Sequence, residues 1–95
     1  MSILAHRIYP AKSESFTFDV WHDEKLVEYL NKEIDFNFSL NIYGTGIVDI
    51  PVELLEKIIT LKRELELDED TIAQIQLDIS NGKSRIGEVV SYHCY

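Results

Sequence analysis

The sequence predicts an α+β fold: a two-layer sandwich in which a four- or five-stranded mixed sheet carries two helices on one face and ends in a C-terminal β-hairpin. Two periodicities underlie this prediction. Segments that alternate apolar and polar residues are typical of half-buried strands, and segments with an apolar residue every three or four positions are typical of helices. An Asn81-Gly82 pair after the last alternating segment adds the signal of a tight turn.

The first strand signals lie in the N-terminal half of the chain. Residues 15–21 place aromatic and branched side chains at every second position, and residues 35–43 do the same over a longer run. The Gly44-Thr45-Gly46 sequence predicts a turn that ends the second of these strands. Residues 3–9 are compatible with an additional edge strand that stops at Pro10.

Two segments have helical periodicity. Residues 24–33 follow Asp23, a residue type that favours the N-cap position. Residues 52–65 follow Pro51, whose missing N–H costs nothing at a helix start. The second helix is expected to bury a stripe formed by Leu54, Leu55, Ile58, Leu61 and Leu65.

Residues 71–80 are compatible with two structures. Apolar residues alternate with polar ones and then reach Asn81-Gly82, which favours a strand and a type I′ turn. The alternative is a helix that ends at Gly82, with a cap near Asp70-Thr71.

The hairpin version makes specific pairings. It places Asp78 opposite Arg85 and turns Glu88 toward the core, unless a bulge at Gly87 shifts the alternation. Glu88 is therefore the candidate for a buried carboxyl group.

Length and charge limit the classes of protein to which the chain belongs. Its 95 residues are expected to form one domain, 1–95, and its formal net charge is −8. Residues 51–70 hold seven acids and three bases, which is half of that charge. Such a field repels nucleic acid and anionic membranes and attracts basic protein surfaces. Without an apolar secretory segment or a run near the ~20 residues that span a bilayer, we expect a cytoplasmic protein.

Sites for chemistry are weakly indicated. His93-Cys94 is the only pair that suggests nucleophilic chemistry, but adjacent strand residues point to opposite faces. His6, His22, Asp23 and Glu24 lack the spacing of a zinc site. We therefore expect no catalytic residues, no metal and no cofactor, with Cys94 a buried apolar residue.

The sequence favours a non-catalytic acidic binding protein. The specific form that we expect is an inhibitor or immunity protein that neutralises a basic partner such as a toxin nuclease. The expected partner-binding residues are five acids and four aromatic anchors: Glu64, Glu66, Asp68, Glu69, Asp70, Trp21, Tyr43, Tyr92 and Tyr95. The alternative is a homo-oligomeric accessory protein, a homodimer for example, that pairs through an open sheet face or through residues 89–95. A third hypothesis is a small enzyme that works through carboxylates or Cys94.

Overall fold

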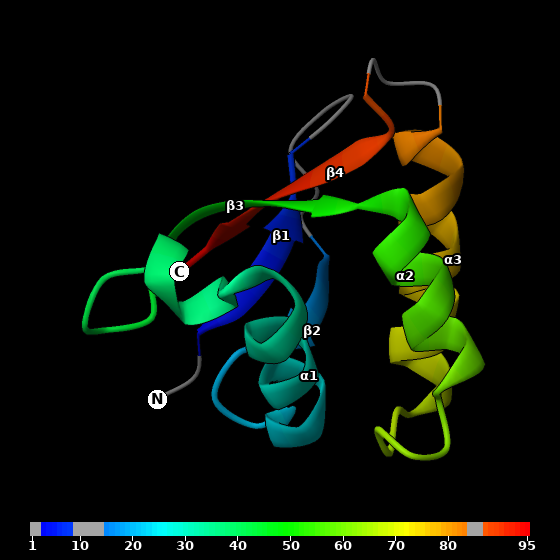
Figure 1. Ribbon diagram of the computed structural model, residues 1–95, viewed down its shortest axis with the longest axis horizontal. Helices are drawn as coiled ribbons and strands as arrows, with labels where there is room; N and C mark the ends of the chain where they lie inside the picture. Colours follow the sequence, from blue (N-terminus) through cyan, green and yellow to red (C-terminus); the bar gives the residue numbers. More distant parts are fainter. Residues whose placement is uncertain (1–2, 9–14, 84–86) are drawn as a thin grey trace.

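The computed structural model describes residues 3–8, 15–83 and 87–95, and these residues form an antiparallel sheet with helices packed against it (Figure 1). The elements in chain order are β1 (Leu4–Arg7), β2 (Phe16–Asp19), α1 (Glu24–Ile34), the 3-10 helix η1 (Phe36–Ser39), β3 (Gly46–Pro51), α2 (Val52–Thr60), α3 (Glu69–Gly82) and β4 (Val89–Cys94). The predicted α+β class is confirmed. The sheet has four strands and is antiparallel rather than mixed, and a third α-helix replaces the predicted hairpin.

The strand order β2-β1-β4-β3 puts the first and the last strand of the described chain, β1 and β4, in the middle of the sheet. The strand predicted within residues 3–9 is confirmed as β1, but its predicted edge position is wrong, because β1 pairs with β2 on one side and with β4 on the other. Tyr9 and Pro10 lie outside the described residues. The edge strands are β2 and β3, and each has one side that no strand of the described sheet pairs with.

One face of the sheet forms the core. The Phe18 ring lies 5.8 Å from the rings of both Phe36 and Tyr92, which joins β2, η1 and β4. The helices add buried aliphatic side chains to the same cluster, among them Leu26, Leu30, Leu55, Ile58 and Ile75. Sheet and helices thus make two layers around one core. No helix within the described ranges has the length and apolar character needed to cross a bilayer.

Residues 35–43 do not form the predicted strand. Asp35 adopts a left-handed conformation, with φ of 52°, and ends α1, and η1 follows immediately. Two asparagine side chains then bind the backbone: Asn31 Oδ1 accepts from Asn37 N, and Asn41 Oδ1 accepts from Tyr43 N. Such local hydrogen bonds compete with a strand ladder. The glycine turn at 44–46 consequently begins β3 instead of ending a strand.

Residues 69–82 form α3, so the strand prediction for 71–80 is wrong and the helical alternative is correct. The cap is Asp68, whose Oδ1 accepts a hydrogen bond of 2.7 Å from Thr71 N. The buried positions of the helix are Thr71, Ile75, Asp78 and Gly82. Their spacing is helical, but only one of the four is a large apolar residue, so hydrophobic periodicity alone does not reveal it.

Gly82 is a packing residue and not a turn residue. A Cβ atom added there would lie 2.6 Å from both Val52 Cγ2 and Val90 Cγ2. The last turn of α3 therefore approaches α2 and β4 more closely than any side chain allows. Glu88, predicted to face the core, is exposed with φ of 47°, and its carbonyl accepts from Val52 N. Its expected neighbour Arg85 lies outside the described residues.

We predict that Gly82→Ala destabilises the protein. Alanine is normally favoured over glycine in a helix by about 1 kcal/mol, but overpacking of a filled core costs typically about 1–3 kcal/mol. The free energy of unfolding from urea titrations should fall by about 1–2 kcal/mol. The exposed substitution Ser80→Ala in the same turn is the control and should leave it nearly unchanged. If Gly82→Ala were more stable than the unmodified protein, the space between Gly82, Val52 and Val90 would be large enough for a methyl group, and the prediction would be wrong.

Candidate partner-binding site

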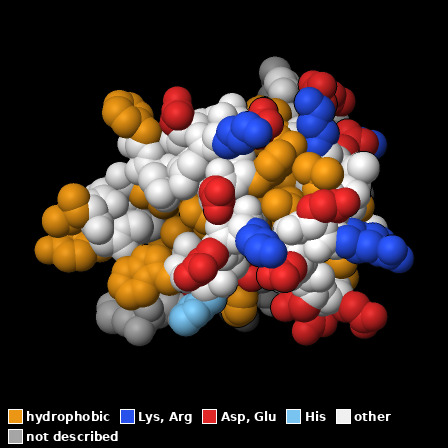
Figure 2. Space-filling model, turned by 60° about the horizontal axis from the view of Figure 1, so that its bottom comes forward, with side chains coloured by type: hydrophobic (Ala, Val, Ile, Leu, Met, Phe, Trp, Pro, Cys, Tyr) orange, Lys and Arg blue, Asp and Glu red, His pale blue; other side chains and the backbone are white. Residues whose placement is uncertain are grey.

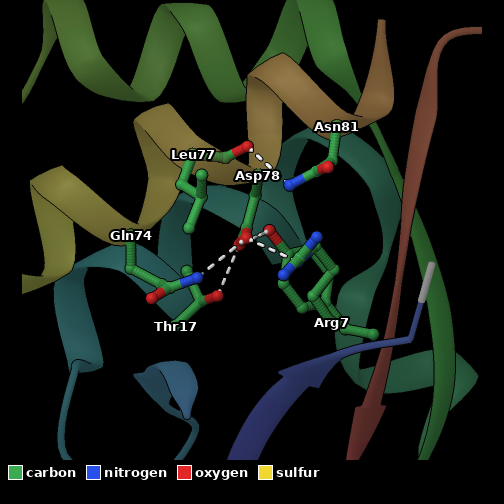
Figure 3. A network of polar contacts seen from close by, with 7 residues as sticks. Arg7, Thr17, Gln74, Leu77, Asp78 and Asn81 are labelled. Atoms are coloured by element: carbon green, nitrogen blue, oxygen red, sulfur yellow. Dashed lines mark hydrogen bonds and ion pairs between the residues drawn. The ribbon is translucent and has the colours of Figure 1, made fainter. Parts of the chain in front are cut away.

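A buried carboxylate on α3 joins the helix to three strands (Figure 3). Asp78 is fully buried, and its Oδ2 accepts hydrogen bonds from Thr17 Oγ1 of β2 at 2.5 Å and from Tyr92 Oη of β4 at 2.7 Å. Its Oδ1 accepts from Gln74 Nε2 at 3.0 Å. Arg7 Nε of β1 lies 3.1 Å from the same oxygen, an ion-pair distance without hydrogen-bond geometry at that nitrogen. We call these five residues the Asp78 network.

The electrostatics of the Asp78 network favour a structural role. Burial raises the pKa of the Tyr92 phenol well above its ordinary value, and the negative charge of Asp78 raises it further. Tyr92 is therefore a neutral donor, and Arg7 supplies the compensating positive charge. Both oxygens of Asp78 are engaged by protein groups. The network consequently holds α3 against β2 and β4.

The position that the Asp78 network gives α3 creates a hollow between this helix and β2. It has a volume of about 740 Å³. Phe16 and Leu77, from opposite walls, are about half exposed, at 47% and 51%. Asp68 and Asp70 also line it, at the start of α3. We call this hollow the β2–α3 groove: an apolar surface bordered by carboxylates.

Further carboxylates gather near the groove. The Asp23 carboxyl accepts a hydrogen bond of 2.6 Å from Asp19 N instead of capping α1. Burial raises the pKa of Asp23, and the nearby negative charges of Asp19 and Asp68 add to that rise. The N–H of Thr71 lowers the pKa of Asp68, which keeps this carboxylate ionised at neutral pH. Asp68 therefore lies at the edge of the groove and also close to the carboxylates of Asp19 and Asp23.

The five predicted acids are all exposed, but they do not form one purely anionic patch. Glu66 makes an ion pair of 3.2 Å with Lys25. Glu64 lines a shallow hollow together with Lys25 and Lys32. In the space-filling view, acidic side chains are interleaved with lysine and arginine over the helices (Figure 2). Of the five predicted acids, Asp68, Glu69 and Asp70 still lie together, because Asp68 caps α3 and the other two are in its first turn.

The predicted aromatic anchors are separated by the fold. Tyr92 is fully buried and bound to Asp78, so its assignment as a surface anchor is wrong. Trp21 and Tyr43 are exposed near the turn before β3, where Trp21 Nε1 lies 3.0 Å from the position of a Cβ on Gly44. Tyr95 stacks on His6 with a centroid distance of 4.4 Å. The apolar residues beside the acids are instead Phe16 and Leu77, which the sequence interpretation missed.

The C-terminal strand is mostly buried, and of residues 89–95 only Tyr95 is exposed. Residues 89–95 were expected to offer an interface between subunits, but β4 lies between β1 and β3, and Val90, Tyr92 and Cys94 are in the core. Burial raises the pKa of the Cys94 thiol to about 12. In the part of the chain that the structure describes, no three His, Cys, Asp or Glu residues are arranged to hold a metal ion.

Comparison of the chain with protein-family models, with curated proteins and with solved structures finds no match. Function is therefore inferred from the surfaces described above.

We predict that Asp78→Asn strongly destabilises the fold. The substitution leaves Arg7 without its anionic partner, and breaking a buried ion pair typically costs about 3–5 kcal/mol. Urea unfolding followed by circular dichroism should show a loss of at least about 3 kcal/mol. Asp70→Asn makes the same chemical change at an exposed position of the same helix and should alter stability by less than about 0.5 kcal/mol. Equal stabilities of the two variants would contradict the role given to the network.

We also predict that the Cys94 thiol is unreactive in the folded protein. With a pKa near 12, almost none of it is thiolate at pH 8, and the side chain is buried. A chromogenic disulfide reagent at pH 8 should label it at least 100 times more slowly in buffer than in denaturing urea. Comparable rates in the two conditions would show that this end of β4 opens readily.

Proposed function

We propose that this chain is a non-catalytic acidic binding protein that docks a basic protein partner at the β2–α3 groove. The observation that carries the proposal is the placement of Phe16 and Leu77, both half exposed, beside Asp68 and Asp70. An apolar side chain of the partner fits between the two walls, and lysine or arginine residues around it face the carboxylates. This is the arrangement of an interface with an apolar centre and a charged rim.

Charge supports a basic partner over other ligands. The net charge of −8 attracts cationic surfaces over distances near the Debye length, about 10 Å at 0.1 M salt. Complementary fields of this kind can raise association rate constants to about 10⁸ M⁻¹s⁻¹ or more at low salt. The acids at the groove then fix the orientation of the bound partner.

The concrete form that we propose is an inhibitor or immunity protein for a toxin nuclease. A nuclease binds phosphates through lysine and arginine, so its substrate groove is a cationic surface that an acidic protein can occupy. The Asp78 network lies beneath the groove and holds its two walls together, because Thr17 of β2 is hydrogen-bonded to Asp78 of α3. The walls are therefore in place before a partner binds. A preorganised surface reduces the entropy lost on association.

The test measures binding of the purified chain to a basic nuclease domain encoded next to it, by calorimetry or biolayer interferometry. We expect the Kd to weaken at least 10-fold between 50 and 300 mM NaCl, because salt screens the charge pairs. Saturating chain should also abolish cleavage of DNA or RNA by the nuclease. Affinity that does not change with salt, or undiminished cleavage in the saturated complex, would overturn the proposal.

Charge variants locate the site. Asp68→Asn/Asp70→Asn removes two charges, and asparagine at position 68 keeps an N-cap acceptor, so helix stability is retained. We expect the association rate constant to fall at least 5-fold at 50 mM NaCl. Glu33→Gln/Glu53→Gln changes the net charge equally in a different hollow, between α1 and α2, and should have a much smaller effect. Equal effects would show that only overall charge matters.

A further inference from the structure

We propose that two copies of this chain form a two-fold symmetric dimer in which β3 of one copy pairs with β3 of the other. The proposal uses a different surface from the β2–α3 groove and goes beyond the proposed function. Three observations support it: an unpaired strand edge, a set of highly exposed apolar side chains beside that edge, and the absence of charge from the same stretch of sequence.

The first observation concerns the backbone of β3. In an antiparallel ladder, every second residue directs its N–H and C=O groups toward the neighbouring strand. The register pairs Val48 with Tyr92 and Ile50 with Val90, and the bond from Val52 N to Glu88 O continues this series. The alternate residues, Ile47 and Asp49, therefore direct their backbone groups away from β4. Among the described residues, no strand pairs with that side of β3.

The second observation is the apolar surface next to this edge. The four most exposed large apolar residues of the described chain are Phe38, Ile42, Tyr43 and Ile47, with exposed fractions of 91%, 92%, 66% and 60%. We call them the apolar rim. The turn that carries two of them is fixed, because Asn41 Oδ1 accepts from the N–H groups of both Tyr43 and Thr45. The rim is thus held in place beside the strand before any partner binds.

The third observation is charge. Residues 36–48 contain no Asp, Glu, Lys or Arg, in a chain that is 27% charged with a net charge of −8. Figure 2 shows several separate groups of hydrophobic side chains at the end of the molecule where Figure 1 places η1 and the turn before β3, whereas most of the charged side chains lie over the helices. Two molecules of the same sign can therefore approach each other at this end with the least repulsion. A basic partner has no carboxylate to contact within this stretch.

The area of the surface suits a second copy. At 150–250 Å² for an aromatic side chain, Phe38 and Tyr43 together expose roughly 300 Å² per copy, and Ile42 and Ile47 add to this area. A standard interface buries about 800 Å² on each partner, and the strand backbone supplies the remainder.

The charge of Asp49 selects the register of the pair. A two-fold axis at Asp49 would place two carboxylates directly opposite each other, which is unfavourable. An axis at Ile47 places this side chain against Ile47 of the second copy and Asp49 against Thr45. Ile47 also exchanges two backbone hydrogen bonds with its counterpart in that register. Asp49 adds no backbone hydrogen bonds in this register, because Asn41 already binds both the N–H and the C=O group of Thr45. The two hydrogen bonds of the Ile47 pair and the side chains around it therefore join the two strands.

Sedimentation equilibrium and light scattering test the proposal on the purified full chain, from 1 to 500 μM. We expect the mass to rise with concentration toward twice the 11.0 kDa of one chain. Ile47→Asp places like charges at the two-fold axis and should weaken the dimer at least 10-fold. Leu77→Asp adds the same charge at a similarly exposed position on α3, at the other end of the molecule, and should leave the dimer intact. Circular dichroism checks that both variants are folded.

Cross-linking tests the register. Because Cys94 is buried, Ile47→Cys introduces the reactive thiol, and mild oxidation should convert most of the protein to a covalent dimer. Leu77→Cys under the same conditions should give little. A mass of one chain throughout the concentration range, a dimer that survives Ile47→Asp, or one that is lost in Leu77→Asp would each overturn the proposal.

Discussion

The arrangement of this protein depends on one carboxylate that is removed from water. Burial of the Asp78 carboxylate is tolerated because two hydroxyl groups, an amide and an arginine surround it and offset the cost of removing it from water. These groups come from β1, β2, β4 and α3 itself, so the helix can satisfy the charge in only one position on the sheet. Apolar contacts alone are less selective, because they tolerate sliding and rotation. The polar contacts thereby fix the walls of the β2–α3 groove.

The molecule separates its charged and its uncharged surfaces. Acids and bases lie over the helices, whereas the stretch from η1 to β3 offers apolar side chains and an open strand edge. The two proposed modes of association therefore do not compete for residues. The proposed binding at the groove would depend on salt, while the proposed contact through β3 would depend on buried apolar area and backbone hydrogen bonds.

Sequence periodicity was sufficient for the elements whose buried stripe is apolar. Residues 24–33 are helical as predicted, because Leu26 and Leu30 follow the helical repeat. The helix predicted over 52–65 is confirmed only for 52–60, since residues 61–66 form turns and Leu61 and Leu65 are only partly buried. In α3 the buried positions are occupied by a threonine, an isoleucine, an aspartate and a glycine. A search for regularly spaced apolar residues therefore does not detect this helix. The stretch 35–43 has the alternation of a strand, but its asparagines bind the local backbone instead.

The candidate site was predictable only in its local part. A dense run of acids between 64 and 70 is visible in the sequence, and these residues are exposed. The ion pair of Glu66 with Lys25, and the placement of Phe16 and Leu77 in one groove, depend on pairings between segments distant along the chain. The only sequence signal for Asp78 is its place three residues after Ile75 and seven after Thr71, which has meaning once the segment is known to be a helix.

The two edges of the sheet differ in a way that limits growth. On β2, the Asp19 N–H is bound by the Asp23 carboxylate, and α3 packs against the strand. The Asp19 N–H is thereby unavailable for pairing with another chain, whereas no strand among the described residues pairs with the outer edge of β3. In the proposed pairing each copy uses its only outer β3 edge, so the contact is isologous and would close after two copies instead of growing into a fibre.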